Sequence, residues 1–188
     1  MNNKFMYLLG LLICLGFAAC DDDVMETGDP PPNPYDGCCA TGSFNGMVDS
    51  SFIYIPNMFT PNFDGFNDFF IVHGSLLRAD MVKSLQIFDQ EGLMMFEASN
   101  IPTNDSQFYW SGSINGTDSI YQGLFNYTVL YDTGISETEI KGSACSYPCG
   151  PGQDQFPTAN IEDCQFSTQH DGVGGLAPGA ISFEEDCF

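Results

Sequence analysis

The amino-acid sequence predicts an all-β fold: an antiparallel β-sandwich with an irregular C-terminal extension fastened by disulfides. Between Ser51 and Gly142, short runs of alternating large and polar residues are separated by Gly, Pro, Asn and Asp, a pattern typical of strands and turns. This region shows no sustained helical periodicity. From Ser143 to Phe188 the chain is rich in Gly, Pro and Cys, and its few periodic apolar positions would not bury a core alone.

The strand-like runs appear in order along the central region. The clearest run has four large residues at a period of two, which places all four on one face of a strand. A tight turn is expected at Asn115-Gly116, because both residues tolerate positive φ. The expected strands are Phe52–Ile55, Asp68–His73, Ser84–Asp89, Leu93–Glu97 and, clearest of all, Phe125–Asp132.

The first twenty residues resemble a bacterial lipoprotein signal. The apolar run Phe5–Phe17 is shorter than the roughly 20 residues that a membrane span requires. Two alanines then precede Cys20 directly, as in the lipobox, where the cysteine is acylated and becomes the first residue of the mature chain. We expect residues 1–19 to be a lipoprotein signal peptide and Cys20 to carry a covalent lipid; the alternative is an ordinary signal with Cys20 incidental.

The residues behind Cys20 indicate where the lipoprotein resides. Asp21, Asp22 and Asp23 resemble the lipoprotein export signal of the Bacteroidota, which accompanies transfer to the cell surface. We therefore expect a lipid-anchored, surface-exposed outer-membrane protein; the alternative is a lipoprotein facing the periplasm. Residues 20–50, acidic and then proline-rich, are expected to form an extended tether of about 3 Å per residue.

The charge of the chain restricts its partners. The formal net charge is -21, and removing Lys4 with the signal leaves three basic residues against 25 acidic ones. Nucleic acids and anionic phosphate surfaces are excluded as partners by electrostatic repulsion. Basic protein surfaces, divalent cations and neutral glycans remain as possible partners.

Six cysteines outside the signal region are expected to form three disulfides, because an even number in an exported chain is typical of a disulfide framework. Neighbouring cysteines rarely bond to each other, so Cys38 and Cys39 should reach two distant partners. We expect those partners to be Cys145 and Cys149, which leaves Cys164 with Cys187. The alternative for the first four cysteines is a zinc site.

A long motif in the loop before the second expected strand resembles a known family. Residues 56–70 read Pro-Asn-x-Phe-Thr-Pro-Asn-x-Asp-Gly-x-Asn-Asp-x-Phe. Together with Leu85-x-Ile87-Phe88, Trp110-x-Gly112 and Phe125-x-Tyr127, it resembles the gliding-motility-associated C-terminal domain, the type B sorting domain of type IX secretion substrates. The resemblance covers residues 51–142 and implies an immunoglobulin-like sandwich with a sorting role.

The chain departs from that family at several points. Phe63 stands where a glycine is usual, and residues 89–92 lack the expected arginine and tryptophan. Residues 143–188 follow the last expected strand, where a sorting domain should end, and a lipid anchor would give the chain its own route to the membrane. We therefore expect the sandwich to be retained as a structural body and the sorting role to be lost.

The loop and the central region offer two further candidate sites. Oxygens from Asn62, Asp64, Asn67 and Asp68 would suit Ca²⁺, whereas the alternative is that these side chains cap backbone groups in Asx turns. Ser119 lies in an Asp-Ser-Ile sequence that resembles the O-glycosylation sequon of exported Bacteroidota proteins.

No recognisable catalytic motif accompanies the two histidines, His73 and His170, so the sequence predicts a protein without enzymatic activity or a required cofactor. The first functional hypothesis is an accessory or structural subunit of an outer-membrane complex for export, barrel insertion or nutrient uptake, with a β-barrel or lipoprotein partner. The second is a free-standing adhesin or glycan-binding module, and the third is retained type IX sorting. The phenylalanines of the extension are candidates for a docking patch: Phe156, Phe166, Phe183 and Phe188.

Overall fold

The computed structural model describes residues 32–76, 78–149, 161–172, 176–177, 179–184 and 187, all of which belong to one compact unit that begins at Pro32. The predicted signal peptide (1–19), Cys20 and the acidic run Asp21–Asp23 lie outside the described residues, as do Phe156 and Phe188. Within the described part of the chain, no helix has the length and apolar character needed to span a membrane.

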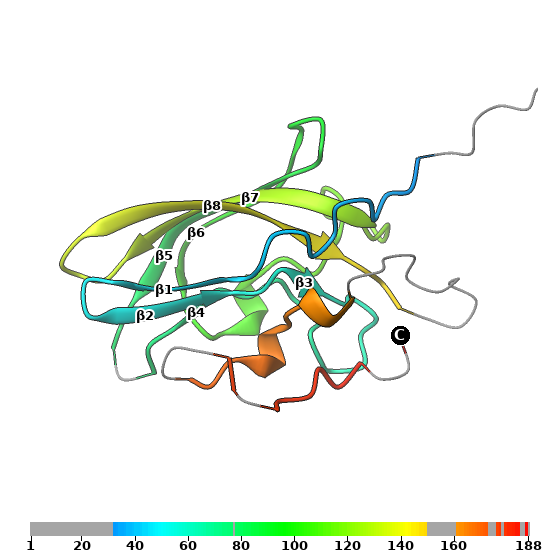
Figure 1. The fold of residues 1–188 in the computed structure, drawn as a ribbon. Coiled ribbons are helices and arrows are strands. Elements are labelled where there is room, and N and C mark those ends of the chain that lie inside the picture. Colours follow the sequence, from blue (N-terminus) through cyan, green and yellow to red (C-terminus); the bar gives the residue numbers. More distant parts are fainter. Residues whose placement is uncertain are drawn as a thin grey trace, which may run out of the picture. The chain divides into compact units, whose positions relative to one another are not determined.

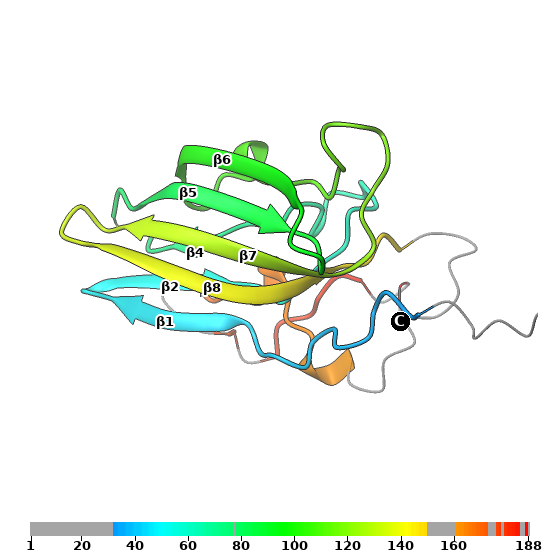
Figure 2. The same ribbon diagram turned by 90° about the horizontal axis from the view of Figure 1, so that it is seen from above.

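The protein is built from two β-sheets that lie one over the other (Figures 1 and 2). The smaller sheet has the order β1-β2-β4, with strands β1 (Phe44–Val48), β2 (Ser51–Ile55) and β4 (His73–Gly74). The larger sheet has the order β3-β8-β7-β5-β6, with strands β3 (Met58–Phe59), β5 (Met81–Phe88), β6 (Met94–Pro102), β7 (Gly123–Asp132) and β8 (Glu137–Ser146). The all-β prediction is confirmed, with one departure: β3 pairs with β8 in parallel.

The main core lies between the two sheets. Strand β7 alternates as the sequence predicts, and its four large residues Phe125, Tyr127, Val129 and Tyr131 are all buried. The side chain of Trp110 lies 5.0 Å from the Phe125 ring and 5.4 Å from the Phe59 ring, centroid to centroid. Aromatic side chains of this size contribute most of the apolar area that a core of this kind buries.

The C-terminal segment adds a third layer over the smaller sheet. All five residues of β2 are buried, which requires cover on both faces of the strand. Ile53 and Ile55 belong to the core, whereas the Tyr54 hydroxyl donates to the Phe166 carbonyl at 2.9 Å. Figure 1 shows the 3₁₀ helices η2 (Ile161–Asp163) and η3 (Ser167–Gln169), in orange, on the side of this sheet away from β5–β8.

Four of the five expected strands form, as β2, β5, β6 and β7. The strand expected at Asp68–His73 is wrong: Phe70 makes one isolated bridge to Trp110, and regular pairing begins only at His73. The loop continues to the left-handed residue Asn67, at φ 46°, which delays the extended backbone. Strands β1 and β8 were not expected. Strand β1 is short and contains Asn45 and Gly46, and the Gly, Ser and charged residues of β8 dilute its alternating pattern. The boundary placed at 142/143 falls inside β8.

The tether expected over residues 20–50 is wrong from Pro32 onward, where the chain folds onto the body. Tyr35, Cys38 and Cys39 are buried in a second apolar cluster with Tyr147, and the amide of Leu124 in β7 donates to the Pro34 carbonyl at 3.1 Å. Strand β1 then pairs along its whole length with β2. Backbone pairing and disulfides hold a sequence whose composition is otherwise that of a linker.

The disulfides connect the N-terminal segment, β8 and the C-terminal segment. The pairs are Cys38–Cys145, Cys39–Cys164 and Cys149–Cys187. The expectation is right that Cys145 bonds to one of the two adjacent cysteines, and wrong in giving Cys149 to the other and Cys164 to Cys187. Cys38 and Cys39 do reach separate partners. The left-handed backbone of Cys39, at φ 59°, helps its side chain diverge from that of Cys38 and reach the C-terminal segment. The sulfurs of the alternative zinc site are distributed over three disulfides.

A substitution at Gly123 tests whether the N-terminal segment, at Pro34, packs against β7. A Cβ at this position would overlap the Pro34 carbonyl, and φ is +106°, so we expect Gly123→Ala to lower the free energy of unfolding by about 3 kcal/mol. Gly116→Ala is the matched control, since φ is +71° but nothing lies within 4 Å, and it should cost only about 1 kcal/mol. Denaturant unfolding of the oxidised chain measures both; equal costs would contradict the seating of Pro34 on β7.

Candidate functional site

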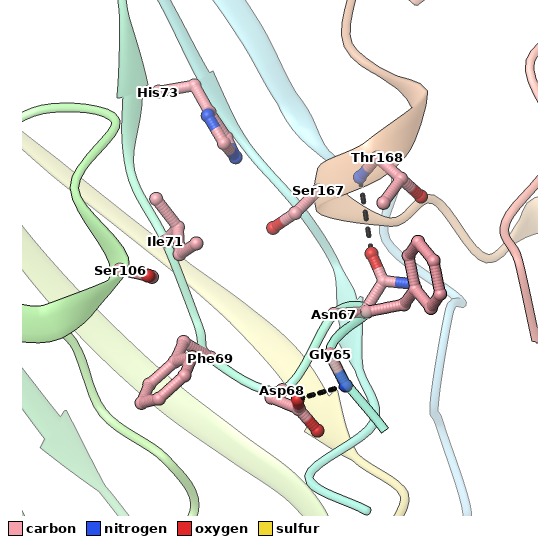
Figure 3. Close-up of a pocket in the computed structure, with 10 residues that line it drawn as sticks. Gly65, Asn67, Asp68, Phe69, Ile71, His73, Ser106, Ser167 and Thr168 are labelled. Carbon is pink, nitrogen blue, oxygen red and sulfur yellow. Dashed lines mark hydrogen bonds between the residues drawn. The ribbon is translucent and has the colours of Figure 1, made fainter. Parts of the chain in front are cut away.

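The loop between β3 and β4, residues 60–72, is held in shape by its own polar side chains. The carboxylate of Asp68 accepts hydrogen bonds from the backbone amides of Phe63 and Gly65, the latter at 2.8 Å (Figure 3). Phe63 has a left-handed backbone with φ 62°, a conformation that favours glycine. This geometry gives a physical reason for the glycine that is usual here, and for the strain that Phe63 adds.

Asn62 and Asp64 form local turns of the Asx type. Oδ1 of Asn62 accepts from the Asp64 amide at 3.2 Å, and Oδ1 of Asp64 accepts from the Phe66 amide at 2.8 Å. The Asn62 amide group also donates to Oδ2 of Asp64 at 2.9 Å. These contacts match the Asx-turn alternative. Calcium binding by this loop stays a prediction.

Asn57 and Asn67, two asparagines of the long motif, bind the C-terminal segment. Nδ2 of Asn67 donates to the Ser182 carbonyl at 2.8 Å. Its Oδ1 accepts from the Thr168 amide at 3.2 Å (Figure 3). Oδ1 of Asn57 accepts from the Gln165 amide at 2.6 Å. The motif therefore joins the family-like body to the segment that follows it.

Glu184 completes this junction from the C-terminal segment. Its side chain is 1 % exposed, and Oε1 accepts from the Thr60 hydroxyl at 2.5 Å and from Nδ2 of Asn67 at 2.9 Å. Oε2 lies 3.1 Å from the sulfur of Cys187, which has no proton to donate because it is disulfide-bonded. Burial raises the pKa of the Glu184 carboxyl, as expected for a charge removed from water with few donors.

The two histidines, isolated in the sequence, are neighbours in the structure. The rings of His73 and His170 lie 4.2 Å apart, and both lie within about 6 Å of the Tyr54 ring, at 6.0 Å and 5.9 Å. Burial, with the neighbouring His170, lowers the pKa of His73 to about 3, so His73 is neutral at physiological pH. Burial also lowers the pKa of His170. The pair connects β2 and β4 with the C-terminal segment.

A cleft of about 320 Å³ opens beside this loop. Residues 65–69, 71 and 73 line one wall, and the 3₁₀ helices η1 (Ser106–Phe108) and η3 supply Ser106, Ser167 and Thr168. Figure 3 shows the outer end of the His73 ring and the Ser167 hydroxyl directed towards the cleft, with Ser106 and Phe69 across from them.

Ser119 lies in the loop 113–120, closed by a bridge between Ser113 and Ile120 and by the expected Asn115-Gly116 turn, where both residues have positive φ. The side chain of Ser119 is exposed. Its glycosylation stays a prediction.

Residues 53–144 match the family model of the CHU_C type IX secretion signal domain. This stretch belongs to that family. The match confirms the resemblance that the motifs indicate, and its bounds run from β2 into β8. The family is one of sorting-signal domains rather than of catalysts, and it implies a protein that is secreted or exposed at the cell surface. A search of curated proteins gave no match.

The sequence did not indicate Glu184 or the cleft. Glu184 is one of 25 acidic residues, and no local pattern marks the one that folding buries. His73, Ser106 and Ser167 are far apart in the chain, so only tertiary packing brings them together. Asn57 and Asn67 lie within the long motif, which was the one available signal.

We expect Asp68→Ala to lower the free energy of unfolding by about 3 kcal/mol, because two backbone amides lose a charged acceptor. Asp118→Ala, at an exposed position, is the control and should change it by less than about 0.5 kcal/mol. Thermal melting of the unmodified chain with and without EDTA separates the structural role from a metal site. A lower melting temperature in EDTA would support calcium binding instead.

The raised pKa of Glu184 predicts a dependence of stability on pH. In the unfolded chain the Glu184 carboxyl has a pKa near the ordinary value of 4.5, so the folded protein binds this proton more tightly than the unfolded chain does. The contribution of Glu184 to the free energy of unfolding therefore falls as the pH rises above 4.5. Glu184→Gln removes this pH-dependent contribution. Between pH 5 and pH 8 the melting temperature of the variant should therefore fall by less than that of the unmodified chain. Glu162→Gln, at an exposed position in the same segment, should follow the unmodified chain. Parallel curves for all three proteins would contradict the buried acid.

Proposed function

We propose that this protein is a non-enzymatic accessory subunit of an outer-membrane complex, anchored by a lipid on Cys20 and exposed at the cell surface. The observation that carries the proposal is the engagement of the family's motif loop by the chain's own C-terminal segment. Asn57 and Asn67 bond to residues 163–184, and Thr60 donates to buried Glu184. A loop occupied in this way serves as structure, which favours a sandwich reused as a body.

Disulfides support the same interpretation. Cys39–Cys164 fixes one end of the C-terminal segment to the N-terminal segment, and Cys149–Cys187 fixes the other end beside Glu184. Such cross-links restrict the unfolded chain and stabilise the attached form. The competing function is retained type IX sorting, which the family match itself favours.

An exposed aromatic pair offers a surface for docking. Phe66 of the motif loop and Phe183 of the C-terminal segment stack with their ring centroids 4.9 Å apart, and they remain 43 % and 49 % exposed. Exposed apolar side chains gathered together are typical of protein contact sites. Phe183 thus fits the docking role expected for the phenylalanines of the extension, whereas Phe166 is buried.

The charge distribution describes the partner surface. Each base of the described residues pairs with a carboxylate: Arg78 with Asp80, Lys83 with Asp132 and Lys141 with Glu139. The remaining acids are in large excess. A complementary partner is therefore neutral or basic, and nucleic acid is disfavoured. An outer-membrane β-barrel or a second lipoprotein meets this requirement.

The proposal predicts that the affinity-tagged, lipidated chain co-purifies in stoichiometric amount with an outer-membrane β-barrel protein or a second lipoprotein in mild detergent. The double variant Phe66→Ser/Phe183→Ser should lose at least about 90 % of the partner, because aromatic anchors dominate interface energies. Leu93→Ser is the matched control: its side chain is 63 % exposed in the β5–β6 turn, and the partner should be retained.

Two outcomes would contradict the proposal. Recovery of the chain as a lone monomer would favour a free-standing adhesin or glycan-binding module. The intact mass of the mature chain should correspond to lipid-modified Cys20 through Phe188. A mature chain that has lost residues after β8 would instead support retained sorting.

A further inference from the structure

The cleft beside the motif loop contains buried polar atoms without a partner. Among the side chains that the structure describes, Nε2 of His73 and Oγ of Ser167 are the two such atoms, and both residues are 8 % exposed. Both residues line the same cleft (Figure 3). A buried polar group left without a hydrogen bond costs stability, so two in one cleft indicate a place where something polar binds.

The tautomer of His73 follows from its neighbours. The backbone amide of Gly74 donates to Oδ1 of Asn104 at 3.3 Å, and Nδ2 of Asn104 donates to the Gly74 carbonyl at 3.1 Å, which fixes the orientation of the amide group. Oδ1 of Asn104 therefore accepts from Nδ1–H of His73 at 3.2 Å. Because the ring is neutral, Nε2 carries a lone pair and accepts a hydrogen bond from a ligand.

The other lining residues define the rest of the ligand. The hydroxyls of Ser167 and Ser106 both donate and accept, so they match groups that do both. The Thr168 hydroxyl donates to the Ser182 carbonyl at 3.0 Å and is left as an acceptor. Phe69 and Ile71 add apolar surface to the same cleft. The ligand therefore has several hydroxyl groups and one apolar face.

Other classes of ligand fit less well. Asp68 lines the cleft and the chain is strongly acidic, which disfavours an anion. An extended peptide needs a free strand edge, but the Phe70 amide donates to the Trp110 carbonyl and the Val72 carbonyl accepts from the Asn104 amide. These two backbone groups of the wall are therefore not available to pair with a peptide on that edge.

We propose that the cleft binds one neutral sugar ring, with O–H groups donating to Nε2 of His73 and exchanging hydrogen bonds with Oγ of Ser167, and with an apolar face against Phe69 and Ile71. The volume of about 320 Å³ suits a single small ligand, since ligand pockets range over about 300–1,000 Å³. This inference goes beyond the proposed docking function. Phe66 of the docking pair also lines the cleft, but His73, Ser167, Phe69 and Ile71, which carry the inference, lie outside that pair. The sugar is either free or the end of a glycan at the cell surface.

The experiment titrates the full oxidised lipoprotein, held in a detergent without sugar headgroups, with glucose, galactose, mannose and N-acetylglucosamine, and with their neutral β-linked disaccharides. We expect millimolar binding of at least one monosaccharide by calorimetry. The ¹⁵N resonance of His73 Nε2 should shift as it accepts a hydrogen bond. Ser167→Ala should weaken binding about tenfold, whereas Ser119→Ala, which removes an exposed hydroxyl elsewhere, should leave it unchanged.

Several results would overturn the inference. No heat and no Nε2 shift with any of the saccharides would do so, as would equal binding by Ser167→Ala and the unmodified chain. Binding of tetra-alanine in place of the sugars would identify a peptide site. Tighter binding of disaccharides than of monosaccharides would assign the ring to a glycan, and equal binding would assign it to a free sugar. Ser167→Ala leaves the Phe66–Phe183 pair in place, so it should weaken sugar binding without reducing partner co-purification, and the two proposals fail separately.

Discussion

The junction between the motif loop and the C-terminal segment determines much of this structure. Asn57, Asn67 and Thr60 lie in or beside the β3–β4 connection, and each bonds to a residue more than 100 positions later in the chain. Each of these hydrogen bonds joins residues far apart in the sequence, so the entropy lost in closing a long loop opposes its formation. Disulfides at both ends of the segment reduce that entropic cost.

The junction adds a layer to the family domain. The C-terminal segment covers the outer face of the β1-β2-β4 sheet, so β2 is buried on both sides. The same covering creates the cleft, because η3 brings Ser167 opposite the wall that contains His73. It also places Phe183 against Phe66, where each ring alone would be an isolated exposed side chain. The addition to the domain thus produces both surfaces to which we assign a function.

Sequence patterns predicted the parts of the fold that depend on local alternation. Strand β7 was clear because its buried and outer residues alternate without interruption. Strand β8 was missed because its inner face carries the small residues Gly142 and Ala144, which do not stand out against the charged and serine residues of the outer face. Strand β1 was missed because it lies in a proline-rich, acidic region whose order comes from β2 and the disulfides. Which cysteines bond to Cys39 and to Cys149 depends on the direction of the backbone at each position, and composition does not encode that direction.

The sequence by itself determined the all-β class, the family of residues 53–144, the formation of disulfides and the acidic charge. These properties are encoded in residue type, in short periods and in one long motif, all of which are local. Only the tertiary structure decided which cysteines pair, which acid is buried and which histidine nitrogen faces the cleft. Those outcomes depend on contacts between residues far apart in the chain, whose geometry exists only after the sheets have packed.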